Sequence, residues 1–191
     1  MKPRIAVFAS GNGSNFEVLA KSCADGTIDA DLVLCVCDKP GAFVETRAER
    51  FGIPVLSFRA RDFESKRDFE RMIADRLDEE KVDLVCLAGY MRIIGEELLE
   101  RYGGRIINIH PALLPSFPGA HAIKDAFEYG VKVYGVTIHY VNDEVDGGKI
   151  IAQTPVEYTG SDIDELETMI HAAEHKLYPA TVSSLLSNLN K

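Results

Sequence analysis

Asn108 and His110 lie two positions apart at the end of an apolar run, and three prolines, at positions 111, 115 and 118, follow them. Side chains at i and i+2 of a strand face the same side, so the sequence predicts that both point into one cleft. An asparagine amide donates hydrogen bonds without charge, and a histidine exchanges a proton near neutral pH. The pair suits a reaction in which a carbonyl oxygen becomes negative while a proton moves. The prolines would stiffen the loop before a substrate arrives.

Asp146 is the third residue of this candidate site. It lies in the segment NDEVDGG (residues 142–148), where Gly147 and Gly148 permit a sharp turn. A carboxylate brought beside His110 would favour the charged imidazolium ring and fix its orientation. Spacing alone leaves two simpler interpretations open: a hydrogen-bonded Asn108–His110 pair that only closes a strand, and a solvated Asp146 in a turn.

A glycine-rich loop follows the first predicted strand, in the segment VFASGNGSNF (residues 7–16). Gly11 and Gly13 permit a tight turn, and we expect Ser14 and Asn15 to cap the helix that follows. Free N–H groups and the helix dipole at such a helix start bind anions. A glycine turn without any ligand has the same sequence.

The obvious alternative for this loop is a dinucleotide-binding fingerprint. That fingerprint requires a third glycine where Phe16 stands, and an acidic residue after the second strand, a position that Asp38 could fill. The missing glycine favours a single phosphate over a pyrophosphate.

The elements that must position these residues alternate along the chain. Nearly continuous apolar runs predict strands at 4–9, 31–37, 54–58, 82–88 and 105–109, and helical spacing predicts helices at 16–24, 42–51, 62–80 and 96–102. This alternation is typical of right-handed βαβ units in a doubly wound, mostly parallel sheet.

The alternation of strands and helices ends near the C-terminus. Two further strands, 132–141 and 149–158, are joined by a connection too short for a parallel crossover, so one must run antiparallel to the other. Ser161 and Asp162 are predicted to cap a last helix, which Pro179 would bend. We therefore expect one α/β domain over residues 1–191, a Rossmann-like sheet with one antiparallel strand.

Composition excludes several classes of protein. The 191 residues include 46% hydrophobic ones and carry a net charge of −9. No signal peptide and no run of about 18 apolar residues is present, so we expect a cytoplasmic protein without membrane association. An acidic chain disfavours nucleic-acid binding. The four cysteines fall mostly in apolar runs without metal-ligand spacing, which predicts buried thiols and no metal site.

Five segments together closely resemble the glycinamide ribonucleotide formyltransferase family, within the wider formyl-folate transferases and hydrolases. They are SGNGSN (10–15), LAGYMRII (87–94), INIHPALLPSFPGAH (107–121), GVTIHYVNDEVDGG (135–148) and EHKLYP (174–179). The resemblance covers nearly the whole chain. It implies transfer of the formyl group of 10-formyltetrahydrofolate, as co-substrate, to the amine of glycinamide ribonucleotide in de novo purine biosynthesis.

The resemblance also implies roles for individual residues. Asn108, His110 and Asp146 match the catalytic trio, and His121 and His139 match supporting histidines. The remaining matches are the phosphate loop Gly13, Ser14 and Asn15; the ribose-binding Glu174; and the folate-binding Met91, Arg92, Ile93, Ile94, Asn142, Asp143, Glu144 and Val145. Lys66 stands where such enzymes often have an arginine beside the folate, so charge is kept but planar bidentate pairing is lost.

Three alternatives remain beside this assignment. A formyl-folate hydrolase would use the same trio with water as acceptor, usually with an N-terminal regulatory domain. A methionyl-tRNA formyltransferase would add a C-terminal RNA-binding domain. We expect neither extra domain here. A non-enzymatic nucleotide-binding module would leave the 107–121 segment unexplained. Dimers occur among such enzymes, so a homodimer stays open.

Overall fold

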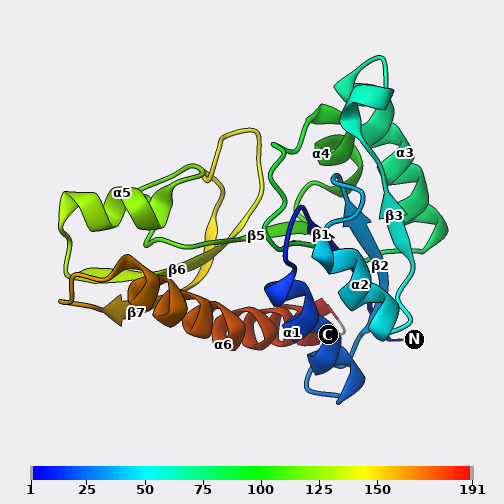
Figure 1. Ribbon diagram of the computed structural model, residues 1–191. Helices are drawn as coiled ribbons and strands as arrows, with labels where there is room; N and C mark the ends of the chain where they lie inside the picture. The colour runs from blue at the N-terminus through cyan, green and yellow to red at the C-terminus, as the bar shows by residue number, and fades with distance from the viewer. Residues whose placement is uncertain (1, 190–191) are drawn as a thin grey trace.

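The computed structural model describes residues 2–189 as strands and helices in close alternation (Figure 1). The elements are β1 (Arg4–Ala9), α1 (Ser14–Ala24), β2 (Asp31–Cys37), α2 (Phe43–Arg50), β3 (Val55–Ser57), a short 3-10 turn (Ala60–Asp62), α3 (Lys66–Glu79), β4 (Leu84–Leu87), α4 (Glu96–Tyr102), β5 (Ile106–His110), α5 (Ala122–Tyr129), β6 (Val133–Tyr140), β7 (Ile150–Glu157) and α6 (Ile163–Leu189).

One seven-stranded sheet runs through the molecule in the order β3-β2-β1-β4-β5-β6-β7. The pairs among β1 to β5 are parallel. Strand β6 is antiparallel to both β5 and β7, so it alone runs against the others. The predicted fold class is confirmed: a single α/β domain with a mostly parallel sheet and one reversed strand near the C-terminus.

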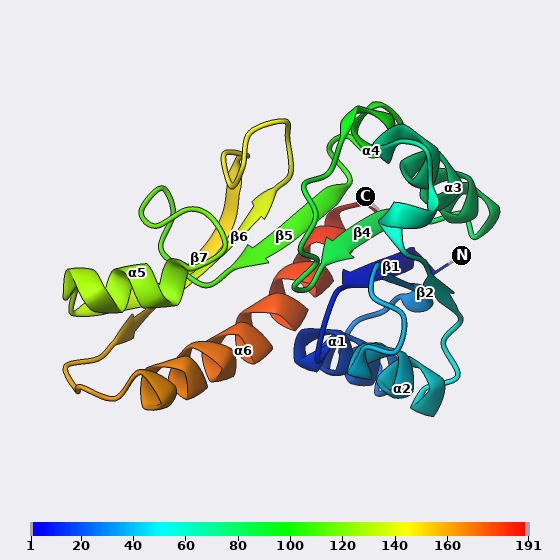
Figure 2. The same ribbon diagram turned by 45° about the horizontal axis from the view of Figure 1, so that its top comes forward.

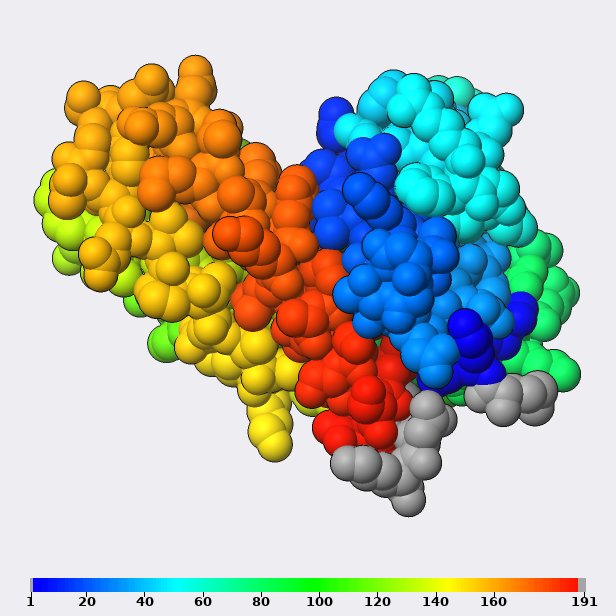
Figure 3. Space-filling model, turned by 90° about the horizontal axis from the view of Figure 1, so that it is seen from below, coloured from blue at the N-terminus to red at the C-terminus, as the bar shows by residue number. Residues whose placement is uncertain are grey.

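Helices cover both faces of the parallel part of the sheet. Along β1, Ile5 and Val7 pack into one apolar cluster with α1, α2 and α6, while Ala6 and Phe8 pack into a second with α3 and α4. Successive side chains of a strand point to opposite faces of the sheet, and both faces are covered here. The sequences of these strands are therefore almost continuously apolar. Figure 2 shows α3 and α4 on one side and α1 and α6 on the other, and Figure 3 shows α6 lying between α1 and β7.

Three sequence expectations need correction. Helix α5 was not predicted; it is short and fully buries only Ala122 and Ala126. Helix α3 begins at Lys66 instead of 62, because the Ser65 side chain caps it by accepting the Asp68 N–H. The expected caps of α1 are wrong as well: Gly13 is the N-cap residue, in the left-handed region at φ 75°, and no side chain caps the helix.

At the other end of the chain the predicted cap is present. The Asp162 carboxylate accepts the N–H of Asp164 at 2.9 Å, and α6 continues through Pro179. Within residues 2–189, no helix combines the length and the apolar character needed to cross a membrane.

Candidate active site

A cleft of about 590 Å³ opens where β1, β4 and β5 end, beneath the loop that joins β6 to β7. Most of the predicted site residues line it, as the rule for open α/β sheets requires. These are Gly13, Ser14, Asn15, Met91, Arg92, Ile93, Ile94, Asn108, His110, Asn142, Glu144, Val145, Asp146 and Glu174. Lys66, His121 and Asp143 are not among the lining residues, although Asp143 belongs to the same β6–β7 loop.

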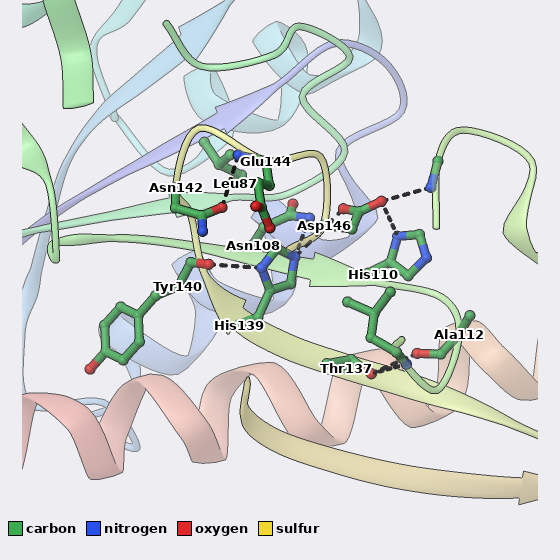
Figure 4. Close-up of polar contacts among 12 residues, drawn as sticks. Leu87, Asn108, His110, Ala112, Thr137, His139, Tyr140, Asn142, Glu144 and Asp146 are labelled. Carbon is green, nitrogen blue, oxygen red and sulfur yellow. Dashed lines mark hydrogen bonds and ion pairs between the residues drawn. The ribbon is translucent and has the colours of Figure 1, made fainter. Parts of the chain in front are cut away.

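The proposed trio converges across the cleft. His110, the last residue of β5, places its Nδ1 atom 3.5 Å from Oδ2 of Asp146 (Figure 4). The Gly119 amide donates a 2.7 Å hydrogen bond to the same oxygen and so holds the carboxylate in place. Asp146 itself adopts φ 52°, a left-handed conformation that aspartate tolerates better than most residues. The structure therefore brings together side chains that are 36 positions apart in the sequence.

Asn108 is oriented by His139, its register partner on β6. The Asn108 Nδ2 atom lies 3.2 Å from Nε2 of His139, whose Nδ1 lies 2.8 Å from the Tyr140 carbonyl oxygen. A carbonyl only accepts, so Nδ1 carries a proton and, in the neutral ring, Nε2 accepts from the amide. The amide nitrogen has two protons, and the second stays available to a substrate oxygen.

Both ring nitrogens of His110 face acceptors. Its Nε2 lies 2.8 Å from the carbonyl oxygen of Phe117, and Nδ1 faces Asp146. Only the doubly protonated ring donates to both partners, so this arrangement suits an imidazolium. Phe117 has φ 53°, so the backbone that presents this carbonyl is held in an unusual conformation for a bulky residue.

Asp146 is built to stay charged. Burial raises the pKa of Asp146, but the nearby His139 ring, the hydrogen bond from the Gly119 amide and the positive charge of His110 outweigh it, so the pKa lies below its usual value. Its Oδ1 atom also lies 3.6 Å from Nε2 of His139. Sequence reasoning gave His139 only a supporting part, whereas it contacts both Asn108 and Asp146.

The glycine-rich loop forms the opposite end of the cleft. A Cβ on Gly13 would meet the Val44 side chain at 2.5 Å, so the loop packs directly on α2. Arg47 of α2 also donates 2.8 Å hydrogen bonds to both the main-chain and side-chain oxygens of Asn12. With no side-chain cap on α1, the amides of its first turn are free to meet an anion.

Glu174 closes this end from α6. Its Oε2 atom accepts from Asn15 Nδ2 at 3.0 Å and lies 2.9 Å from Nδ1 of His171. That hydrogen bond raises the pKa of His171. Among residues 2–189, no group hydrogen-bonds to the buried Oδ1 atom of Asn15. His171 was missed in the sequence, because its place beside the loop depends on α6 packing against α1.

Among the residues predicted to bind folate, three apolar side chains are exposed toward the cleft. Met91 and Ile93 are each 60% exposed and Val145 is 54% exposed, all within the cleft. Lys66 lies at the start of α3, with Nζ 3.8 Å from Oε1 of Glu70, whose Oε1 also accepts the Gly95 N–H at 2.7 Å. Lys66 is thus close in space to the end of the 91–94 segment but outside the cleft.

The structure also bears on two other predictions from the sequence, a ribose-binding role for Asp38 and the burial of the cysteines. Asp38, the residue considered for a dinucleotide ribose, is buried and already bonded to Ser10 and Arg92, so it is not free to bind a ribose. Of the four cysteines, Cys35, Cys37 and Cys86 are buried and Cys23 is partly buried, all as free thiols. In the described part of the chain, no cluster of three or more His, Cys, Asp or Glu side chains is placed to hold a metal ion.

Comparison with known proteins identifies the family. A family profile described as "Formyl transferase" matches residues 3–182. The chain belongs to the formyl transferase family. As a formyl transferase it is an enzyme of the transferase class, and the resemblance seen in its sequence motifs is confirmed.

Individual relatives agree with this assignment. The chain is 49% identical over 189 residues to phosphoribosylglycinamide formyltransferase of Bacillus subtilis (strain 168), covering 98% of this chain and 97% of that one. It is 40% identical to a segment of the trifunctional purine biosynthetic protein adenosine-3 of Drosophila melanogaster, covering 97% of this chain and 14% of that protein. The crystal structure of glycinamide ribonucleotide transformylase 1 from Geobacillus kaustophilus superposes with a TM-score of 0.95 at 46% identity, covering 97% of this chain and 100% of that one.

Proposed function

We propose that this formyl transferase moves the formyl group of 10-formyltetrahydrofolate to the amine of glycinamide ribonucleotide, a step of de novo purine biosynthesis. One observation carries the proposal: the His110–Asp146 pair and the uncapped start of α1 line the same cleft. A phosphorylated amine held at that helix start would lie in the same cleft as the pair. The names of the relatives support the same reaction.

The reaction proceeds by direct attack. The neutral amine of the ribonucleotide bonds to the formyl carbon, and the formyl oxygen becomes an oxyanion. Asn108 donates its free amide proton to that oxygen, and His110 donates the Nε2 proton that Phe117 otherwise accepts. Preorganised donors of this kind are each worth roughly 10²–10³ in rate.

Asp146 acts through His110. Its negative charge, 3.5 Å away, attracts the positive charge of the doubly protonated ring and holds the ring correctly turned while the oxyanion exists. The adduct then collapses: the bond from carbon to N10 of the folate breaks, the amine nitrogen loses a proton, and N10 gains one by way of His110 or a water that it positions. Because the Phe117 carbonyl occupies Nε2 here, the 111–121 loop must shift before His110 reaches the substrate.

Binding is divided between the two ends of the cleft. Gly13, Ser14 and Asn15 hold the phosphate through main-chain amides, and Glu174 accepts from the ribose hydroxyls. The folate pterin lies between residues 91–94 and 142–146, held largely by backbone groups. A contact of Lys66 with the folate stays a prediction, as do a homodimer and a cytoplasmic location.

Formyl transfer assayed with and without glycinamide ribonucleotide tests the proposal, read by the absorbance of the released folate. We expect release only when the ribonucleotide is present. Release at the same rate in its absence would make water the acceptor and the chain a hydrolase. No release with either acceptor would contradict the function altogether.

A further inference from the structure

We propose that Ser10 and Asp38 couple the two substrate subsites, so that binding of one substrate strengthens binding of the other. Neither residue was assigned a role in the reaction above, and the inference rests on the proposed function. Ser10 lies directly before the phosphate loop, and Asp38 directly follows β2. Both are buried, at 3% and 4% exposure, beneath the cleft. They act as positioning residues and need not touch either substrate.

Two hydrogen bonds of Ser10 join the phosphate loop to residues 89–94, here called the folate loop, and a third reaches Asp38. Its N–H donates to the Gly89 carbonyl at 3.1 Å. Its hydroxyl accepts the Met91 N–H at 2.9 Å and donates to Asp38 Oδ1 at 2.5 Å. A hydroxyl has one proton, so accepting from Met91 and donating to Asp38 fixes its direction.

Asp38 connects Ser10 to a second residue of the folate loop, Arg92. Its second oxygen accepts from Nε of Arg92 at 2.7 Å, and its side chain is only 2% exposed. A buried carboxylate is costly unless it is paired and hydrogen-bonded, so the Ser10 and Arg92 contacts are strongly favoured to persist together. One carboxylate thereby ties the ends of β1 and β2 to the loop that follows β4.

The folate loop is held to the core at Tyr90, which packs edge-on against Phe8, and at the buried Ile94. Met91, between these two anchors, is 60% exposed, so the direction of its N–H depends on the Ser10 hydroxyl and on the Arg92–Asp38 pair beside it. A phosphate seated on the amides after Gly11 would steady Ser10, and with it the Met91 N–H. A pterin bound against residues 91–94 would stabilise the same hydrogen bond between Met91 and Ser10. Ligands that order a shared element bind with positive cooperativity, and the coupling is reciprocal.

The coupling is measured by titration calorimetry with a pair of ligands that cannot react. Glycinamide ribonucleotide is titrated alone and in the presence of saturating tetrahydrofolate, which has no formyl group to transfer. For the unsubstituted enzyme we expect the ribonucleotide Kd to fall about fivefold or more, and the reverse titration to give the same factor. In Ser10→Ala and Asp38→Asn the factor should fall to about one, while each ligand alone still binds.

Asp78→Asn is the matched control. Asp78 also accepts from a hydroxyl, that of Tyr102 at 2.6 Å, and pairs with an arginine, Arg101; unlike Arg92, the partner of Asp38, neither Tyr102 nor Arg101 lines the cleft. It should lower the melting temperature without changing the coupling factor. A general loss of stability would reduce coupling in both aspartate variants, whereas the proposed link reduces it in Asp38→Asn alone.

The outcomes separate the two claims. The coupling would be overturned if tetrahydrofolate left the ribonucleotide Kd of the unsubstituted enzyme unchanged. It would also be overturned if tetrahydrofolate lowered the Kd of Ser10→Ala as much as that of the unsubstituted enzyme. Either result would leave the proposed function intact. If Asp38→Asn fails to fold, Ser10→Ala decides the matter, because it leaves the Asp38–Arg92 pair in place. Binding of neither ligand would overturn the proposed function and the coupling with it.

Discussion

Replacing Asp146 by asparagine removes the charge that faces His110 and keeps the shape of the side chain. The new amide oxygen can still accept the Gly119 N–H, so the loop keeps its anchor. At 3.5 Å, a unit charge pair interacts by roughly 5 kcal/mol at an effective dielectric constant of about 20. The asparagine also avoids the cost of burying a charge, so the loss in the transition state should be somewhat smaller, about 4 kcal/mol. That corresponds to a fall in kcat of about 10³-fold.

The assay is steady-state formyl transfer to glycinamide ribonucleotide, with kcat and both KM values measured separately. Both KM values should change little, because Asp146 acts on the oxyanion through His110. Asp125→Asn, an exposed aspartate on α5, serves as the control and should behave like the unsubstituted enzyme. A kcat within about threefold of normal for Asp146→Asn would refute the reasoning, since it corresponds to a net loss of less than about 1 kcal/mol.

Three further changes give distinct signatures. Gly13→Ala should raise the ribonucleotide KM at least about tenfold and lower Tm, because its Cβ meets Val44 at 2.5 Å and φ is 75°; a normal KM would contradict the packing argument. Lys66→Ala should raise the folate KM more than it lowers kcat, and the opposite pattern would contradict a contact of Lys66 with the folate. Glu174 raises the pKa of His171 above its ordinary 6.5, so the stability this pair contributes is complete below 6.5 and lost as the pH rises through the raised value. His171→Gln should therefore lower Tm at about pH 6 and have little effect at about pH 9; an equal shift at both would argue against the charged pair.

The fold was predictable because its signals are local. Strands β1 and β2 were predicted with their observed bounds, since two-sided burial makes their sequences continuously apolar. The short β6–β7 connection predicted the reversed strand. Helix α5 was not predicted, because its eight residues bury little apolar surface and so show only a weak helical spacing of apolar residues.

Site residues could be predicted from the sequence where the alternation of side chains along one strand decides which way they face. Contacts between elements that are far apart in the sequence could not be predicted. Asn108 and His110 follow from the period of β5, but the placing of His139 beside Asn108 needs the β5–β6 register. The expected capping role of Asn15 failed because its amide turns instead to Glu174, 159 positions away. The Ser10–Asp38–Arg92 link joins the ends of separate strands, and no local pattern reveals it.

The central claim is that Asp146 works through His110, and a double-mutant cycle in kcat tests it most directly. The single variants Asp146→Asn and His110→Gln are compared with the variant that carries both. If the carboxylate acts only by holding and charging the ring, the double variant should be no slower than His110→Gln alone. Losses that multiply, as for two independent groups, would contradict the account.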